Sequence, residues 1–267
     1  MAAAHERWAG FLRQIVQRHD EVSREAGACA TEALAQTGFD PTPIGTAWGA
    51  IDMRLADLER KIDDTWSAQV ERAFETEGYD RAAITAAREE GLRLRHELED
   101  RRETLHHRIF ADIARRMYAR ALSERTDRAC PRCGAGLELP ITFRALQVAC
   151  AHCRALATFE PGTLMRSVVA WGAHALASEA AHAQWLAMRA ADRATRSVRP
   201  PIPLALLKEY EGAQIAYWTA YVTARAQLEP EMRDVSLEVR SRMNAWYRFN
   251  AEHEPEWVRA GRPCALV

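Results

Sequence analysis

Four cysteines near the middle of the chain form its most specific chemical pattern. They stand in two Cys-x2-Cys pairs separated by sixteen residues, within the stretch CPRCGAGLELPITFRALQVACAHC: Cys130, Cys133, Cys150 and Cys153. Two residues between cysteines allow a tight turn that directs both sulfurs to one point, and two such turns complete a tetrahedral site. The spacing therefore predicts that these four residues are the ligands of one metal ion.

The segment from residue 128 to residue 159 resembles the zinc-ribbon family. Its first turn reads Cys-Pro-Arg-Cys-Gly, in which Pro131 stiffens the turn and Gly134 lets backbone amides approach the thiolates. The resemblance implies a structural Zn²⁺ on the four cysteines and a short β-hairpin from LELPITFRALQVAC, to which ALATF would add a strand. Arg154 stands where many ribbons have a second glycine. The rest of the chain resembles no family.

A site closed by four sulfurs leaves no coordination position for a substrate, so we expect a structural metal. A disulfide pair and a rubredoxin-like iron site remain as alternatives. A segment of about thirty residues buries too little apolar area to fold alone, and metal ligation would supply the missing free energy.

Composition points to a folded cytoplasmic protein. The 267 residues are 48% hydrophobic and 27% charged, with a formal net charge of −1, which excludes a polycation or an acidic tail protein. The stretch from Leu164 to Met188 is the most apolar, but it contains Arg166, Glu179 and two histidines, so we expect no membrane span. In a reducing compartment, paired cysteines are more often metal ligands than disulfides.

Apolar periodicity predicts a mainly α-helical chain, an elongated antiparallel bundle of about six helices with the ribbon as a small β insert. We expect helices over 3–35, from Trp48 to Phe74 with a coiled-coil-like seam, and over 81–124 with Asp80 as N-cap. A fourth would start at EPG (160–162), with Pro161 in its first turn, and end near 198. Two more would follow the break RPPIP and be separated near Pro230. The predicted domains are a long-helix region (1–126), the ribbon (127–160) and a C-terminal helical region (161–267).

Arginines are concentrated in the segment from Arg101 to Arg132, which holds nine of them against four acidic residues. Such a surface could contact phosphates, with salt-dependent affinity. A nucleic-acid-binding protein is therefore one alternative function, with these candidate contacts: Arg115, Arg116, Arg120, Arg128 and Arg132.

Two Glu-x-x-His pairs, Glu103/His106 and Glu179/His182, suggest a second alternative, because di-iron bundle enzymes use such pairs on different helices. Such enzymes also need carboxylates from two further helices, and we expect none on the apolar seams of the first two. The sequence contains no phosphate-binding loop, nucleophile elbow or His-Glu-x-x-His motif. The leading prediction is a non-catalytic zinc-binding scaffold or adaptor that presents the ribbon to a protein partner.

Overall fold

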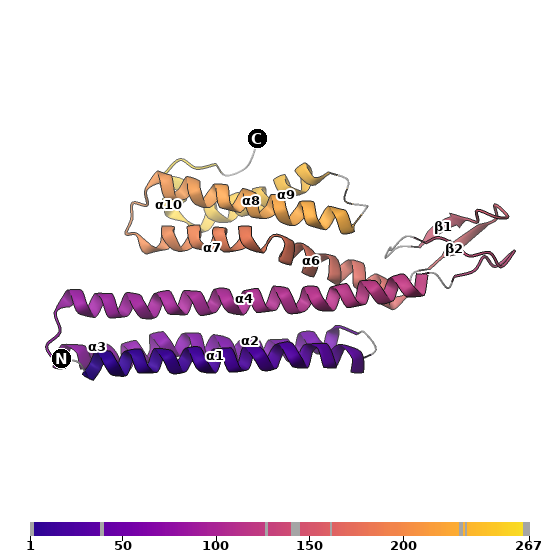
Figure 1. The fold of residues 1–267 in the computed structure, drawn as a ribbon. Helices are drawn as coiled ribbons and strands as arrows, with labels where there is room; N and C mark the ends of the chain where they lie inside the picture. The colour runs from indigo at the N-terminus through magenta and orange to yellow at the C-terminus, as the bar shows by residue number, and fades with distance from the viewer. Residues whose placement is uncertain are drawn as a thin grey trace. The chain divides into compact units, whose positions relative to one another are not determined.

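The computed structural model describes residues 3–37, 40–125, 128–139, 145–160, 162–229, 232 and 234–263. This part of the chain is mainly α-helical with one small antiparallel sheet, which confirms the predicted fold class (Figure 1). The elements are α1 (Ala3–Gln36), α2 (Thr42–Thr65), the π-helical turn η1 (Trp66–Val70), α3 (Glu71–Thr76), α4 (Arg81–Arg125), β1 (Leu146–Ala149), β2 (Leu156–Phe159), α5 (Thr163–Ser167), the π-helical turn η2 (Val168–Gly172), α6 (Ala173–Ala180), α7 (His182–Ser197), α8 (Leu204–Leu228), α9 (Val235–His253) and α10 (Pro255–Arg259).

Most helices lie near the predicted ranges, but α2 begins at Thr42 and not near Trp48 as predicted. The Asp80 side chain accepts a hydrogen bond from the amide of Ala83 (2.7 Å) and caps α4 as predicted. The single helix expected from EPG (160–162) to 198 begins with α5 at Thr163 and is divided at Ala181 into α6 and α7. Pro161, expected in its first turn, lies outside the described residues. The short helix α10 was not predicted from the sequence, because five residues are too few for a periodic pattern. No helix in the described ranges is both long and apolar enough to cross a membrane.

The chain divides into two compact units, residues 1–109 and 110–267, and α4 continues across the boundary. In the first unit α1 and α2 lie side by side (Figure 1). Their predicted apolar faces form a core with the first part of α4, in which Trp8, Trp66 and Phe74 are buried. Gly91 is required there, because a Cβ atom at this position would lie 2.6 Å from the Trp8 ring.

A buried ionic network also ties these helices together. Arg102 of α4 donates a hydrogen bond to the Glu59 carboxylate of α2 (2.9 Å) and another to Asp52. His19 of α1, which is 1% exposed, lies with its Nε2 atom 3.6 Å from the same Glu59 carboxylate. Glu59 is itself only 4% exposed. The expectation that the apolar seam of α2 carries no carboxylate is therefore wrong.

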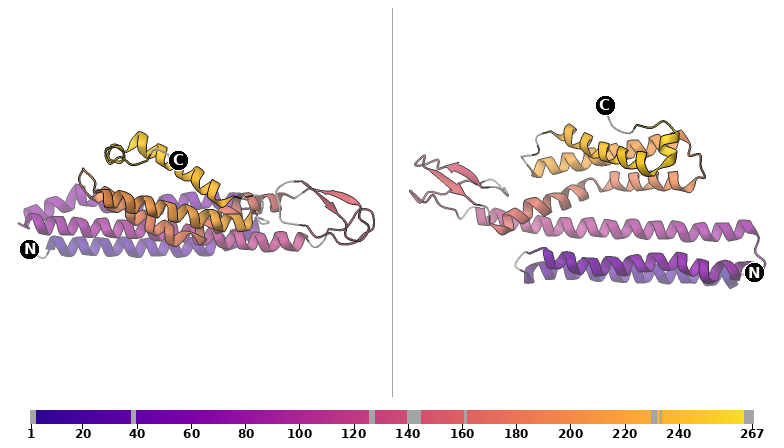
Figure 2. Two further views of the ribbon diagram at one scale, coloured as in Figure 1. Left: turned by 90° about the horizontal axis from the view of Figure 1, so that it is seen from above. Right: turned by 180° about the vertical axis from the view of Figure 1, so that it is seen from behind.

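In the second unit, η2 packs closely on the last part of α4, because a Cβ atom at Gly172 would lie 3.4 Å from both Ala114 and Tyr118. Helices α7, α8 and α9 pack side by side (Figures 1 and 2). Two clusters that contain aromatic side chains join α8 to α9, one around Tyr221, which also includes Ala177 of α6, and one around Trp257 of α10. The ribbon precedes these helices in the sequence and packs on α5 through Met165. A cavity lies among α7, α8, α9 and α10.

Candidate metal centre

The four cysteines come together as the spacing predicts. Their sulfur atoms all lie within 4.8 Å of one another, with 3.7 Å between Cys130 and Cys153 and 3.7 Å between Cys133 and Cys150. A tetrahedral zinc ion with bonds of about 2.3 Å would place its sulfurs about 3.8 Å apart. Disulfide-bonded sulfurs would be about 2 Å apart. The donor set and its spacing therefore fit a metal ion, and all four cysteines are free thiols.

Each pair of cysteines sits in a turn with the same backbone hydrogen bonds. In the first turn the Cys130 amide donates to the Ala135 carbonyl (2.7 Å), and the Gly134 amide donates to the Cys130 carbonyl (2.9 Å). In the second turn the corresponding bonds join Cys150 to Ala155 and Arg154 to Cys150, both at 2.9 Å. The equivalence explains why two short Cys-x2-Cys sequences can direct four sulfurs to a common centre.

Backbone amides already favour thiolates at two of the four positions. The amides of Arg132 and Cys133 lower the pKa of the Cys130 thiol to about 7. The amides of Cys153 and His152 likewise lower the pKa of Cys150. The Ala135 amide lowers the pKa of Cys133, but desolvation and the neighbouring sulfurs outweigh it and raise that pKa to about 12. Metal uptake must therefore displace protons, and acidification is expected to weaken it.

The β-hairpin of this segment differs in its pairing from the one expected. Strands β1 and β2 pair antiparallel, with Leu146 opposite Phe159 and Ala149 opposite Leu156, so the second cysteine turn is their connection (Figure 2). The predicted strand in ALATF is confirmed. Residues 137–139 of the segment LELP form no strand, and the isolated bridge before them joins Ala129 to Gly136. Residues 140–144 lie outside the described part.

The inner face of the hairpin is fixed to the helical frame. Leu139 and Phe159 are buried together with Met165 of α5, at 1%, 8% and 6% exposure. The outer face is exposed and carries no charge: Gln147, Ala149, Leu156 and Thr158. Leu156 is 70% exposed. One face of the sheet thus anchors the ribbon, and the other presents an uncharged surface to solvent.

Arg154 has a left-handed backbone conformation, with φ of 57°, and Gly134 at the equivalent position of the first turn has φ of 76°. A non-glycine residue in this conformation costs about 1–2 kcal/mol, and the Arg154 side chain is exposed. We therefore expect Arg154→Gly to tighten metal binding about fivefold and Gly134→Arg to weaken it. Competition with a chromogenic chelator measures both shifts. Equal affinities for both variants and the unmodified chain would contradict this account of the turns.

The predicted basic contacts are not a set of free cations. Arg115 forms an ion pair with Glu179, and Arg116 pairs with Asp112 at 2.9 Å. The Arg128 guanidinium lies 5.9 Å from the centre of the Phe159 ring. Arg120 also interacts with another group of the protein. Arg132 is exposed in the first cysteine turn. Part of the positive charge that suggested phosphate binding is therefore neutralised by neighbouring carboxylates.

The two Glu-x-x-His pairs fall in different units of the chain. Glu103 and His106 cluster with His107, and a hydrogen bond with His106 lowers the pKa of Glu103. The His106 ring also stacks on Trp48, with 5.2 Å between ring centres. No cluster of three or more metal-binding side chains in the described ranges contains Glu179 or His182. Glu179 pairs with Arg115, and His182 stacks on Trp185.

No protein-family model, curated protein or solved structure matches this chain. The function must therefore be argued from the site itself.

Proposed function

We propose that this protein is a non-catalytic scaffold or adaptor that binds one structural Zn²⁺ and presents the ribbon between α4 and α5 to a protein partner. The observation that carries the proposal is the convergence of four thiol sulfurs at tetrahedral spacing. Four thiolates favour zinc among the common divalent ions, and they fill its coordination sphere. A zinc ion held this way stabilises structure and leaves no position for substrate.

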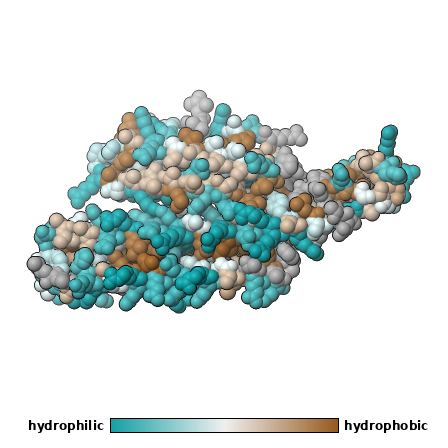
Figure 3. Space-filling model, viewed as in Figure 1, coloured by the Kyte–Doolittle hydropathy of each residue, from teal (hydrophilic) through white to brown (hydrophobic). Residues whose placement is uncertain are grey.

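The composition of the ribbon supports a protein partner. Its outer sheet face has no charged side chain, and Leu156 places an apolar group in solvent at 70% exposure. The space-filling view shows hydrophobic side chains among hydrophilic ones on the ribbon (Figure 3). A two-stranded sheet also leaves backbone groups at its edges that can pair with an added strand. Nucleic acid would instead require cations on the contacting face.

Affinity capture with matched variants of the zinc-loaded chain tests this proposal. Leu156→Asp changes the ribbon face, while Leu237→Asp makes the same change at a leucine of α9 that is 63% exposed. We expect one protein from the native host to be retained in stoichiometric amount by the unmodified chain and by Leu237→Asp, and to be lost with Leu156→Asp. Retention by both variants, or loss from both, would contradict the assignment of the ribbon face.

Nucleic-acid binding is tested separately by filter binding of RNA and DNA fragments. The adaptor proposal predicts no retention at about 50 mM salt, where phosphate contacts are strongest. Affinity that is high at this salt concentration and falls steeply by about 200 mM would favour a nucleic-acid-binding function instead. Arg132→Ala, in the first cysteine turn, would then show whether the ribbon takes part.

A further inference from the structure

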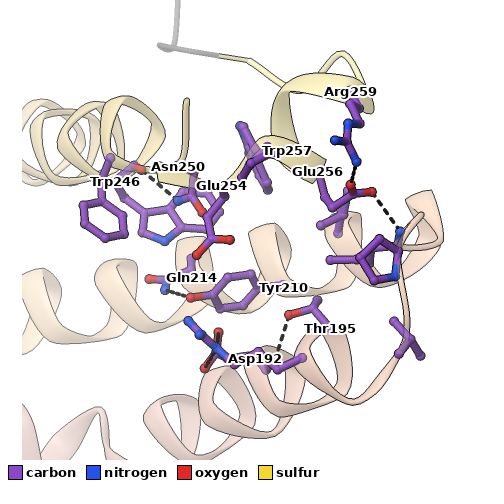
Figure 4. A pocket seen from close by; sticks show the side chains of 17 residues that line it. Asp192, Thr195, Tyr210, Gln214, Trp246, Asn250, Glu254, Glu256, Trp257 and Arg259 are labelled. Atoms are coloured by element: carbon purple, nitrogen blue, oxygen red, sulfur yellow. Dashed lines mark hydrogen bonds and ion pairs between the residues drawn. The ribbon is translucent and has the colours of Figure 1, made fainter. Parts of the chain in front are cut away.

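The second unit contains a cavity of about 650 Å³ that takes no part in the metal centre. It lies between α7, α8, α9, α10 and the connection that precedes α8, and Figure 4 shows the side chains around it. Its volume falls within the range of about 300–1,000 Å³ that is usual for small-molecule sites. The wall is largely apolar and aromatic, with Ile202, Leu207, Tyr210, Trp246 and Trp257 among its residues.

The aromatic rings form corners instead of one flat surface. Tyr210 and Trp246 meet edge to face, with 5.3 Å between ring centres and an interplanar angle of 80°. Trp246 and Trp257 meet in the same way, at 4.9 Å and 79°. Tyr210 and Trp246 are only partly buried, so their rings remain open to the cavity. The electron-rich faces of tyrosine and tryptophan attract cations.

The charged groups around the cavity leave one carboxylate without a partner. Arg196 binds both oxygens of Asp192 (3.0 and 3.1 Å), and Arg259 forms an ion pair with Glu256. Glu256 also accepts a hydrogen bond from the Ile202 amide (3.3 Å). Glu254 makes no side-chain hydrogen bond or ion pair with a residue in the described ranges. Its negative charge contributes to the raised pKa of Arg196 without direct contact. Three carboxylates therefore face two guanidinium groups, both already paired.

The side chain of Glu254 is not used to cap a helix. It directly precedes α10 but accepts no hydrogen bond from an amide of that helix. Figure 4 shows its carboxylate directed toward Tyr210 across the cavity. Burial raises the pKa of Tyr210, and nearby Asp192 adds to this, so the hydroxyl stays neutral. The cavity thus combines aromatic faces, a neutral hydroxyl and one carboxylate that has no hydrogen-bond or ion-pair partner in the described ranges.

We propose that this cavity binds a small organic cation, an amine or quaternary ammonium group attached to an apolar body. The cationic group would lie between Glu254 and the rings of Tyr210 and Trp246. The apolar body would fill the part lined by Ile202 and Leu207. An anion would meet the carboxylate and no unpaired cation of the lining, and a neutral apolar molecule would leave the carboxylate desolvated and unpaired.

Isothermal titration calorimetry with benzyltrimethylammonium tests the proposal on the full, zinc-loaded chain. We expect saturable binding with one site per chain, and weaker binding of neopentylbenzene, which has nearly the same shape without the charge. Glu254→Gln is expected to weaken binding of the cation about tenfold, because it removes the charge but keeps the side-chain shape. Glu252→Gln is the matched control, since it removes the same charge from an exposed residue of α9 outside the cavity.

Three results would overturn the proposal. The first is absence of saturable binding of benzyltrimethylammonium up to millimolar concentration. The second is equal affinity for the cation and its neutral counterpart. The third is an equal change in affinity for the cation in Glu254→Gln and Glu252→Gln. The cation would then bind away from Glu254, or its affinity would depend only on the net charge of the protein.

Discussion

Replacing Cys150 by serine is expected to release the metal and unfold the ribbon while the helices of the first unit stay folded. Cys150 is 1% exposed and contributes one of four sulfurs, so a hydroxyl at this position removes a strong ligand from a closed site. Structural zinc contributes about 10–16 kcal/mol to the folding of comparable zinc-finger peptides. The ribbon's own apolar core is small: Leu139, Phe159 and Met165, with partly buried neighbours. It is not expected to hold the hairpin without the metal.

Amide hydrogen exchange measures this effect element by element. Protection of β1, β2 and both cysteine turns should fall to the level of an unfolded chain in Cys150→Ser, and also in the unmodified chain treated with a strong chelator. Cys29→Ser is the control, because Cys29 is an exposed thiol of α1 in the other unit and should change nothing. A ribbon that keeps its protection in Cys150→Ser would show that the hairpin folds without the metal.

Glu59→Ala is expected to destabilise the first unit by about 3–5 kcal/mol, because it leaves the largely buried Arg102 guanidinium without one of its two hydrogen-bonded carboxylates. The Arg102 side chain is only 16% exposed and keeps Asp52 and a longer contact with Glu103 (3.7 Å) after the substitution. Burial lowers the pKa of Arg102, but the hydrogen bond with Asp52 and the charge of Glu59 outweigh this and raise it. Arg102 therefore stays charged, and deprotonation cannot reduce the cost of losing the Glu59 carboxylate.

Urea unfolding of the first unit, followed by hydrogen exchange in α1, α2 and the first part of α4, gives the size of the change. Asp57→Ala is the matched control on the same helix, because Asp57 pairs with Arg60 on the surface, where the two side chains are 60% and 66% exposed. Exposed pairs contribute about 0–1 kcal/mol. If Glu59→Ala costs no more than Asp57→Ala, the buried network does not stabilise the unit as argued.

The sequence predicted the helices and the metal site because both depend on local spacing. The apolar period of α1 and the two Cys-x2-Cys turns each specify a structure within a few residues. The positive φ that Arg154 shares with Gly134 was not predicted and appears only in the structure.

Features that depend on contacts between distant residues could not be predicted in the same way. Glu59 reads as a surface residue until α4 brings Arg102 against it. The pairing of β1 with β2 depends on which neighbour each strand meets, and the composition of the ribbon did not specify this. The cavity is built from four helices and a connection. Glu254 becomes part of its lining only when α8 and α9 pack together.

Metal analysis of the purified, reduced chain tests the central claim most directly. The account predicts one zinc ion per chain with all four sulfurs of the cluster bound, and no zinc in Cys150→Ser. A chain that contains no metal and still keeps the ribbon protected from hydrogen exchange would contradict it.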